Sequence, residues 1–187
     1  MPLDRMGART VSTLPIETER LRIRHFTADD WPAVHAYTGD ASVMTYLPEG
    51  VMTEEQTRQF IAESMTEEAR TYVIDLLAED RLIGHVGFHP WFAPRIYELG
   101  WVFHPRYHRQ GYAAEAAAAL LRYGFESLSV HRVIATCQPE NRPSWRVMEK
   151  LGMQREAHFR KCIYRGERWW DEYLYAILEE EWCAAAA

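Results

Sequence analysis

The sequence has too few cysteines for a disulfide framework or a zinc knuckle. Cys137, Cys162 and Cys183 are odd in number, far apart and without a C-x-x-C pair. Long apolar runs are also missing, because no stretch of 18 residues is apolar and residues 1–14 contain no apolar segment typical of a secretory signal. We therefore expect a soluble protein of the reducing cytoplasm, with no membrane contact.

Excess positive charge is missing as well. The formal net charge is −6, from 21 basic and 27 acidic residues, which argues against a nucleic-acid partner because phosphate binding needs clustered Lys and Arg. The chain contains neither the G-x-x-x-x-G-K-[ST] loop nor the G-x-G-x-x-G fingerprint. These absences argue against a P-loop nucleotidase and against a dinucleotide-binding enzyme.

What is present is the composition of one globular domain. The 187 residues are 48% hydrophobic and 26% charged, enough for a single core. We expect the domain over residues 15–182, with tails at 1–14 and 183–187. Apolar alternation and runs predict strands at 21–26, 72–78, 82–88, 96–103, 133–137, 158–164 and 173–178. Helical spacing and start signals predict helices at 31–37, after the Thr53–Gln56 capping box, from Gly111 to Leu128 and at 144–151. The predicted class is mixed α/β (α+β), with helices on both faces of the sheet.

The segment from His104 to Ala114 predicts an anion site. It joins the strand at 96–103 to the helix that opens at Gly111, and no Ser, Thr, Asp or Asn caps that helix. The first turn of a helix has unpaired N–H groups and a partial positive charge, which a ligand anion can satisfy. Gly111 and the small Ala113 leave room for a phosphate, and Arg109 adds positive charge.

In order and spacing, a set of short motifs resembles the GNAT superfamily of acetyltransferases, and within it the RimJ/RimL-like branch. The resemblance extends from Glu17 to Trp182. The motifs are Glu17-Thr18-Glu19-Arg20-Leu21, Glu98-Leu99-Gly100-Trp101, the run from His108 to Ala116, Leu128-Ser129-Val130-His131-Arg132-Val133, Pro139-Glu140-Asn141-Arg142-Pro143-Ser144, and Met148-Glu149-Lys150-Leu151-Gly152-Met153. The family's phosphate motif, Q/R-x-x-G-x-G/A, departs here only at its first position, which is His108.

The resemblance implies a single GNAT-type domain whose mostly antiparallel, twisted sheet of about seven strands splays between its fourth and fifth strands, where Gly100 lies. It also implies acetyl-coenzyme A as co-substrate. By this resemblance the main-chain amides of the phosphate loop hold the pyrophosphate, the backbone of the fourth strand pairs with the pantetheine arm, and Asn141 adds a side-chain contact. The implied cofactor residues are Trp101, Val102, Phe103, Arg109, Gln110, Gly111, Tyr112, Ala113, Ala114 and Asn141.

Glu98 and Ser144 are the candidate catalytic residues. Glu98 precedes the implied thioester site on the same strand, so we expect it to be the general base, with an exposed or substrate-orienting carboxylate as the alternative. The tyrosine that many GNAT enzymes use as acid is replaced by Met148. Ser144 is the nearest substitute, unless it only caps the helix that follows. No metal is expected, since His85 and His89 on one strand would lie about 13 Å apart.

The expected activity is transfer of acetyl to a primary amine, either a protein or peptide N-terminus or a small molecule such as an antibiotic or polyamine. The alternative from another class is an acyl-coenzyme A-binding or protein-interaction module that has lost turnover. The acceptor pocket is expected between residues 44–48 and the last hairpin, where Trp169-Trp170-Asp171 either wall the site or only pack the hairpin. The sequence leaves open whether the chain forms a homodimer.

Overall fold

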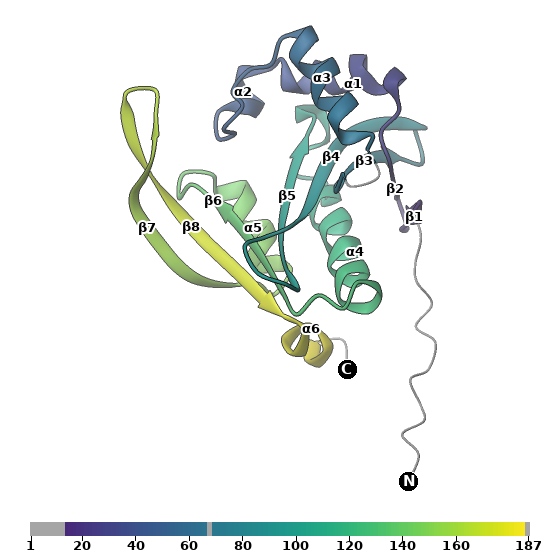
Figure 1. Ribbon diagram of the computed structural model, residues 1–187. Helices are drawn as coiled ribbons and strands as arrows, with labels where there is room; N and C mark the ends of the chain where they lie inside the picture. Colours follow the sequence, from purple (N-terminus) through teal and green to yellow (C-terminus); the bar gives the residue numbers. More distant parts are fainter. Residues whose placement is uncertain (1–13, 67–68, 186–187) are drawn as a thin grey trace.

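In the computed structural model, residues 14–66 and 69–185 are described, and they form one sheet covered by helices on both faces (Figure 1). The sheet order is β1-β2-β3-β4-β5-β6-β8-β7. The strands are β1 (Ile16–Glu17), β2 (Leu21–Arg24), β3 (Thr71–Leu76), β4 (Arg81–Pro90), β5 (Ile96–Phe103), β6 (Arg132–Cys137), β7 (Gln154–Arg165) and β8 (Arg168–Leu178). All pairs are antiparallel except β5–β6. The predicted class and the mostly antiparallel sheet are confirmed, with two-residue β1 as the additional strand.

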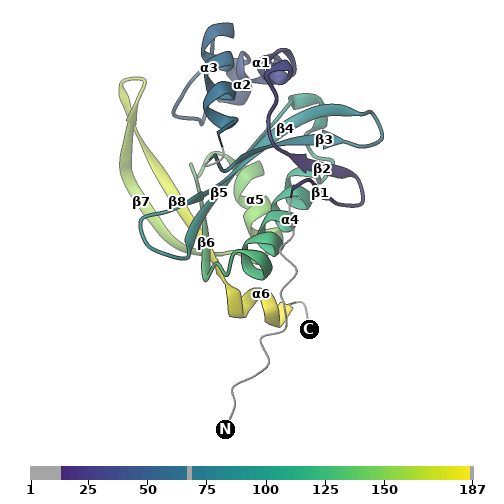
Figure 2. The same cartoon turned by 45° about the vertical axis from the view of Figure 1, so that its right-hand side comes forward.

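The helices divide between the two faces because neighbouring strand residues point to opposite sides. The described helices are α1 (Trp31–Thr38), α2 (Ala41–Met44), α3 (Glu54–Ser64), α4 (Tyr112–Ser127), α5 (Arg142–Lys150) and α6 (Glu179–Ala185). On β3, Val73 packs in the small core under α1 and α3, whereas Tyr72 and Ile74 belong to the large core under α4 and α5 (Figure 2). In the described part of the chain, no helix combines the length and apolarity needed to cross a bilayer.

The predicted strands and helices are present, and several of their boundaries differ. The Thr53–Gln56 capping box is formed, with hydrogen bonds of 2.8 and 3.2 Å. Helix α5 begins at Arg142 rather than Ser144, because Pro143 suits the first turn of a helix, so Ser144 is not its cap. The tail expected from residue 183 begins inside α6, while residues 186–187 and 1–13 of the expected tails lie outside the described residues.

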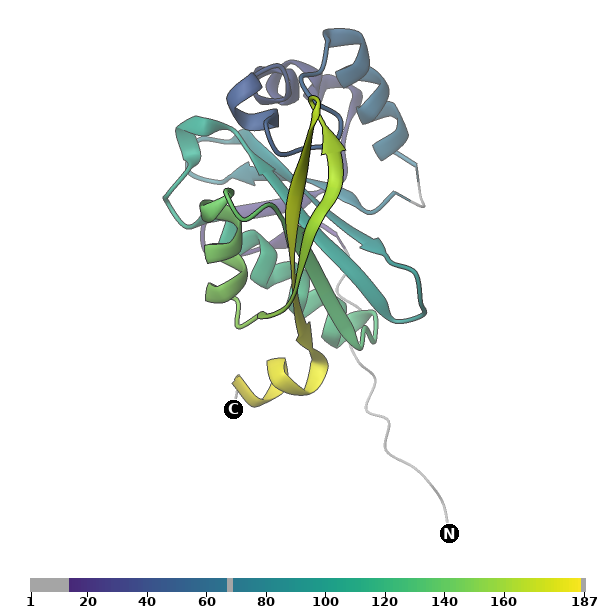
Figure 3. The same cartoon turned by 90° about the vertical axis from the view of Figure 1, so that its left-hand side faces the viewer.

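The one parallel pair in the sheet is short. Strands β5 and β6 pair only at three positions, from Ile96 opposite Arg132 to Glu98 opposite Ile134, although both continue beyond them. After Glu98 the two strands diverge, as the resemblance implied. The β7–β8 hairpin continues past the end of β6, and its tip reaches the loop that follows α2 (Figure 3).

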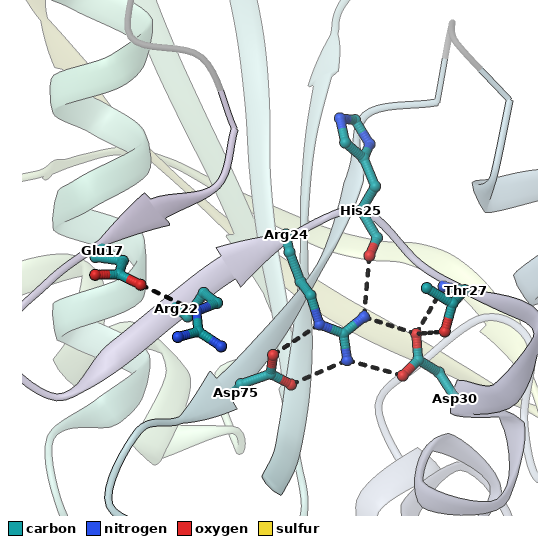
Figure 4. A network of polar contacts seen from close by, with 7 residues as sticks. All are labelled: Glu17, Arg22, Arg24, His25, Thr27, Asp30 and Asp75. Carbon is teal, nitrogen blue, oxygen red and sulfur yellow. Dashed lines mark hydrogen bonds and ion pairs between the residues drawn. The ribbon is translucent and has the colours of Figure 1, made fainter. Parts of the chain in front are cut away.

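At the other end of the strand order, an ion-pair network centred on Arg24 links β2 and β3 to the start of α1 (Figure 4). Its guanidinium donates to Asp75 on β3 at 2.7 and 3.1 Å and to Asp30, just before α1, at 2.8 Å twice. The two aspartates are only 7% and 8% exposed. Burial opposes ionisation of Asp30, but the hydrogen bonds from Arg24 and Thr27 hold its pKa below the ordinary value. The network thus joins β2, β3 and the start of α1.

Replacement of Arg24 by leucine is expected to destabilise the protein by about 3–5 kcal/mol at pH 7, because it leaves two buried carboxylates without their cation. The matched control is Arg22→Leu, whose exposed pair with Glu17 is worth less than about 1 kcal/mol. The contribution of Asp30 is present above its unfolded pKa and is lost as the pH falls through its lowered native pKa. Urea unfolding followed by tryptophan fluorescence should show the two variants converging at acidic pH, and equal losses at pH 7 would contradict the network's role.

Candidate functional site

A cavity of about 540 Å³ opens where β5 and β6 diverge. It lies on the α1–α3 side of the sheet and extends toward the start of α5. Most of its walls come from β4, β5, the end of β6, α5, the loop after α2 and the β7–β8 hairpin, and α1, α2, α3 and β3 contribute one residue each. The cavity brings together five residues predicted from the sequence, namely Glu98, Trp101, Val102, Asn141 and Ser144.

The β5 wall of the cavity has backbone groups without a strand partner. Residues 99–103 of β5 pair with β4 on one edge, whereas the β5–β6 register ends at Glu98, which leaves the other edge without a strand partner. A Cβ placed on Gly100 would meet nothing within 4 Å, so this position faces open space. An extended ligand can therefore lie along Trp101 to Phe103 and hydrogen-bond to the main chain, as an added strand would.

Beyond the end of β5, the chain forms the uncapped helix start that the sequence predicts. Gly111 is the N-cap of α4, with a φ of +86° that favours glycine, and no side chain in the described part of the chain caps it. Arg109 also has a positive φ, +62°. His108 holds the loop to β5 through its Nε2 atom, which lies 2.8 Å from the Phe103 carbonyl oxygen. The amides at 112–114 are therefore available to an anion.

Arg20 braces this loop, a role that the sequence reasoning missed. Its guanidinium donates to the Gln110 carbonyl oxygen at 3.1 Å and to the carboxylate of Glu115, in the first turn of α4, at 2.7 Å. Thr18 donates to the same carboxylate at 2.6 Å. Burial opposes ionisation of Glu115, but these hydrogen bonds keep its pKa below the ordinary value. The signal was the Glu17–Leu21 motif, whose partner lies about 95 residues away in the chain and so is not visible locally.

The opposite wall carries Asn141, Ser144 and Met148 from α5. Asn141 is the N-cap of α5 without capping it through its side chain. Ser144 lies close enough to Cys137, at the end of β6, to lower the pKa of its thiol, and both residues line the cavity. Met148, at the position of the family's tyrosine, is 1% exposed and lines the cavity too. Met148 has no hydroxyl, so on this wall the hydroxyl comes from Ser144 instead.

The sequence reasoning did not place a cysteine at the site, and Cys137 is there. Burial raises the pKa of its thiol to about 12, a shift that the hydrogen bond from Ser144 only moderates. The thiolate, which is the nucleophilic form, is therefore scarce at neutral pH. Cys137 is a poor candidate for an acyl-enzyme in spite of its position.

Glu98 faces a second carboxylate, Glu172 of β8, which sequence reasoning also missed. Burial first, and then the charge of Glu172, raise the pKa of Glu98, while a hydrogen bond from Thr136 at 3.4 Å opposes the shift. Burial likewise raises the pKa of Glu172, and Thr136 again opposes it. The alternation of side chains along β8 could have indicated it, because Glu172 points to the same face of the strand as the buried Leu174 and Ala176.

The loop after α2 and the tip of the β7–β8 hairpin meet across the cavity and form part of its wall. Arg165, near the hairpin tip, donates to the Leu47 carbonyl oxygen at 2.8 Å. The hairpin contributes Ile163, Arg165 and Glu172 to the lining. Of the two alternatives for the tryptophan pair, the structure favours hairpin packing, because neither tryptophan is among the residues that line the cavity. Trp169 is 57% exposed and contacts Tyr164 of the same hairpin, and Trp170 donates to the Arg165 carbonyl oxygen at 3.2 Å.

The histidines of β4 also line the cavity. His85 is half-buried, its Nδ1 atom lies 2.8 Å from the Tyr37 hydroxyl, and desolvation lowers its pKa to about 4, so the imidazole is neutral at physiological pH. His89 lies 3.3 Å from the Thr71 hydroxyl. Among the described residues, no cluster of three or more His, Cys, Asp or Glu side chains is arranged to hold a metal ion.

The predicted cofactor residues thus fall in two places. Trp101, Val102 and Asn141 line the cavity, whereas Phe103 is the last residue of β5 and residues 109–114 lie beyond it, around the start of α4. A second cavity, of about 630 Å³, lies between α5 and the β7–β8 strands and contains none of the predicted residues. The site is therefore the opening between β5 and β6.

Comparisons with known proteins agree with this geometry. A model of the acetyltransferase (GNAT) domain matches residues 20–154. The uncharacterized N-acetyltransferase YnaD of Bacillus subtilis is 55% identical over 89% of this chain and 98% of its own length. The crystal structure of a GNAT-family acetyltransferase from Bacillus anthracis is 57% identical, with a TM-score of 0.85 over 88% of this chain and 98% of that one. More distantly, the ribosomal protein uS5-alanine N-acetyltransferase of Escherichia coli is 26% identical over 45% of this chain and 43% of its own length.

These similarities confirm the resemblance drawn from the motifs, and with it the assignment as an enzyme. The family match covers the loop at the start of α4 and the divergence of β5 from β6. The chain belongs to the GNAT family and is an N-acetyltransferase.

Proposed function

We propose that this enzyme moves the acetyl group of acetyl-coenzyme A to a primary amine by direct attack while both substrates are bound. The observation that carries the proposal is the position of Glu98. It is half-buried and is the last β5 residue that pairs with β6, where the unpaired strand edge meets the cavity. A proton acceptor there lies between a site for the donor and a site for the acceptor.

Two features support coenzyme A as the donor's carrier. The uncapped start of α4, with Gly111 in a left-handed conformation, fits a pyrophosphate held by the amides of Arg109, Gln110, Gly111, Tyr112, Ala113 and Ala114. The free edge of β5 at Trp101, Val102 and Phe103 fits the amide groups of a pantetheine arm, with Asn141 on the facing wall. Bound there, acetyl-coenzyme A supplies an acetyl group activated as a thioester.

Glu98 is the base in this proposal. A primary amine must lose a proton before it attacks, which at pH 7 costs roughly 1–1.4 kcal/mol for an α-amino group and ~4.6 kcal/mol for a lysine. One positioned carboxylate, worth about 10²–10⁴-fold, covers the first cost easily and the second barely. This arithmetic favours an α-amine, and the distant relative that acetylates an alanine of a ribosomal protein points the same way.

Ser144 is proposed to serve the leaving group. Attack of the amine nitrogen forms the C–N bond and breaks the C–S bond, and the departing sulfur then takes a proton. The Ser144 hydroxyl lies on the α5 wall beside Cys137 and faces the same cavity as Glu98. It is able to donate a hydrogen bond to the sulfur, directly or through water.

A small-molecule amine is the second candidate acceptor. The cavity carries the carboxylates of Glu49, Glu98 and Glu172 against the single guanidinium of Arg165, a balance that suits a cationic acceptor. Loss of turnover, the remaining alternative, has less support because both candidate catalytic groups face the cavity.

The direct test incubates the enzyme with acetyl-coenzyme A and a panel of peptides and small amines. We expect coenzyme A release and an acetylated product, and Glu98→Gln should lower kcat by about 10² or more. The control is Glu167→Gln, an exposed carboxylate at the hairpin turn outside the cavity. If Glu98→Gln retains more than half of kcat on the best acceptor, Glu98 is not the base.

Gly111→Ala should weaken coenzyme A binding. A side chain in this left-handed position costs roughly 1–2 kcal/mol of strain and disturbs the amides of the loop. The matched control is Gly166→Ala, which has a φ of +56° and open space around it at the hairpin turn. Titration calorimetry should find a weaker Kd only for Gly111→Ala, with similar losses of thermal stability in both. Unchanged affinity would remove the α4 start from the proposal.

Cys137→Ala tests direct attack against an acyl-enzyme. Because the pKa of the Cys137 thiol is raised to about 12, we expect kcat to change by less than about threefold, a packing effect of roughly half a kcal/mol. Intact-protein mass spectrometry after incubation with acetyl-coenzyme A alone should show no acetyl-enzyme. A covalent acetyl adduct that disappears in Cys137→Ala, together with loss of turnover, would establish the two-step route instead.

A further inference from the structure

Glu172 is a second carboxylate in the cavity, and no role has yet been given to it. It comes from β8, whereas Glu98 comes from β5, and β6 lies between these two strands in the sheet. Both are half-buried, and both line the cavity. The topology therefore places two negative charges in one opening from strands that are distant in sequence.

Thr136 connects the two carboxylates. It lies on β6 two residues after Ile134, the partner of Glu98, and it pairs with Leu174, two residues after Glu172. Its hydroxyl donates to Glu98 at 3.4 Å, and it lies close enough to Glu172 to oppose the rise in the pKa of that carboxyl. A hydroxyl has only one proton to donate, so it satisfies one carboxylate at a time. The pair is thus short of donors.

The other groups around the pair do not fill this deficit. The titratable or charged residues of the same cavity are Tyr46, Glu49, His85, His89, Cys137 and Arg165. His85 is neutral, since burial lowers its pKa to about 4, and burial with the charge of Arg70 also lowers the pKa of His89. The cation, Arg165, donates to the Leu47 carbonyl oxygen. The cavity therefore has a net negative charge. Among the described residues, Arg165 forms no ion pair with Glu98 or Glu172.

We propose that Glu98 and Glu172 together form the binding site for the ammonium group of the acceptor. The inference rests on the proposed function, since it deepens the acceptor half of that site. A primary ammonium carries three N–H donors and one positive charge, which matches two carboxylates that share a single hydroxyl. The acceptor therefore arrives protonated, and a neutral amine is not selected at the entrance.

The surrounding walls specify what the ammonium is attached to. Apolar side chains also line this cavity, among them Met44, Leu47, Met52, Phe60 and Ile163. These surfaces favour an apolar or aromatic carrier close to the nitrogen, because burial of apolar area is favourable. The acceptor class is a primary ammonium on an apolar stem, such as an N-terminal residue with an uncharged side chain.

The two carboxylates have different tasks in this arrangement. Glu98 accepts one proton from the ammonium and becomes neutral, and the resulting amine is free to attack. Glu172 stays ionised and keeps the remaining N–H groups oriented. Loss of Glu172 should therefore weaken acceptor binding more than it slows the chemical step.

Steady-state kinetics on the best acceptor separate these tasks. Glu172→Gln should raise the acceptor KM by about tenfold to a hundredfold, as for loss of a charged hydrogen bond, and change kcat far less. It also removes a negative charge that raises the pKa of Glu98, so the acidic limb of kcat/KM should move to lower pH. Thr136→Val removes a hydrogen bond that lowers both pKa values, so the same limb should move to higher pH. Glu167→Gln, outside the cavity, should change neither the acceptor KM nor the position of the acidic limb.

A binding measurement keeps the proposal testable without turnover. Full-length protein with ¹³C-labelled glutamate carboxyls is titrated with acid alone, with phenethylamine, and with phenethyl alcohol as the neutral isostere. Glu98→Gln and Glu172→Gln assign the two signals. The amine should lower both pKa values, because a nearby cation favours the carboxylate, and the alcohol should not.

The outcomes distinguish the two proposals. If the amine moves neither carboxyl signal more than the alcohol does, the ammonium site is wrong, whether or not acetyl transfer occurs. If the amine moves both signals but no acceptor in the panel is acetylated, the ammonium site stands and the proposed function fails. A Glu98 pKa that is unchanged in Glu172→Gln would also overturn the pairing.

Discussion

The divergence of β5 from β6 after three paired residues is the constraint on which the rest of the structure depends. Unpaired strand edges are costly unless something satisfies their amide and carbonyl groups, so a sheet interrupted in its middle needs covering structure and a ligand. Helices α4 and α5 cover one face beside the opening, and α1 to α3 with the hairpin cover the other. Gly100, which faces open space, keeps the gap free of side chains.

This interruption gives the site two chemically different halves. At the start of α4, the amides held in place by the brace between Arg20 and Glu115 present positive character to the proposed acetyl donor. On the α1–α3 side, Glu98 and Glu172 present negative charge to an acceptor. Glu98 belongs to both halves because it is the last residue before the strands diverge. The proposed reaction therefore takes place where the pairing of the sheet ends.

Local features were predictable from the sequence, and long-range partners were not. The strand at 96–103, the Thr53–Gln56 capping box and the helix opened by Gly111 depend on residues within a few positions of one another. Glu172 enters the site only because β8, rather than β7, lies next to β6, and sequence order does not specify that arrangement. Arg165 meets Leu47 across 118 positions in the same way. The proposed coenzyme A site depends mainly on one local turn and was therefore easier to predict from the sequence than the proposed acceptor site.

The environment of Glu98 also bears on how difficult its proton transfer is. A carboxyl with the ordinary pKa of 4.5 is a much weaker base than an α-amine of pKa near 7.7–8.0, and the gap of about 3 units corresponds to roughly 4–5 kcal/mol. Burial and the charge of Glu172 raise the pKa of Glu98 and so narrow this gap. The same burial would exclude an isolated ammonium, but the second carboxylate compensates for its desolvation. In the proposed arrangement a pair of carboxylates therefore serves both needs, since Glu172 offsets the charge of the ammonium and its own charge also raises the pKa of Glu98, the proposed base.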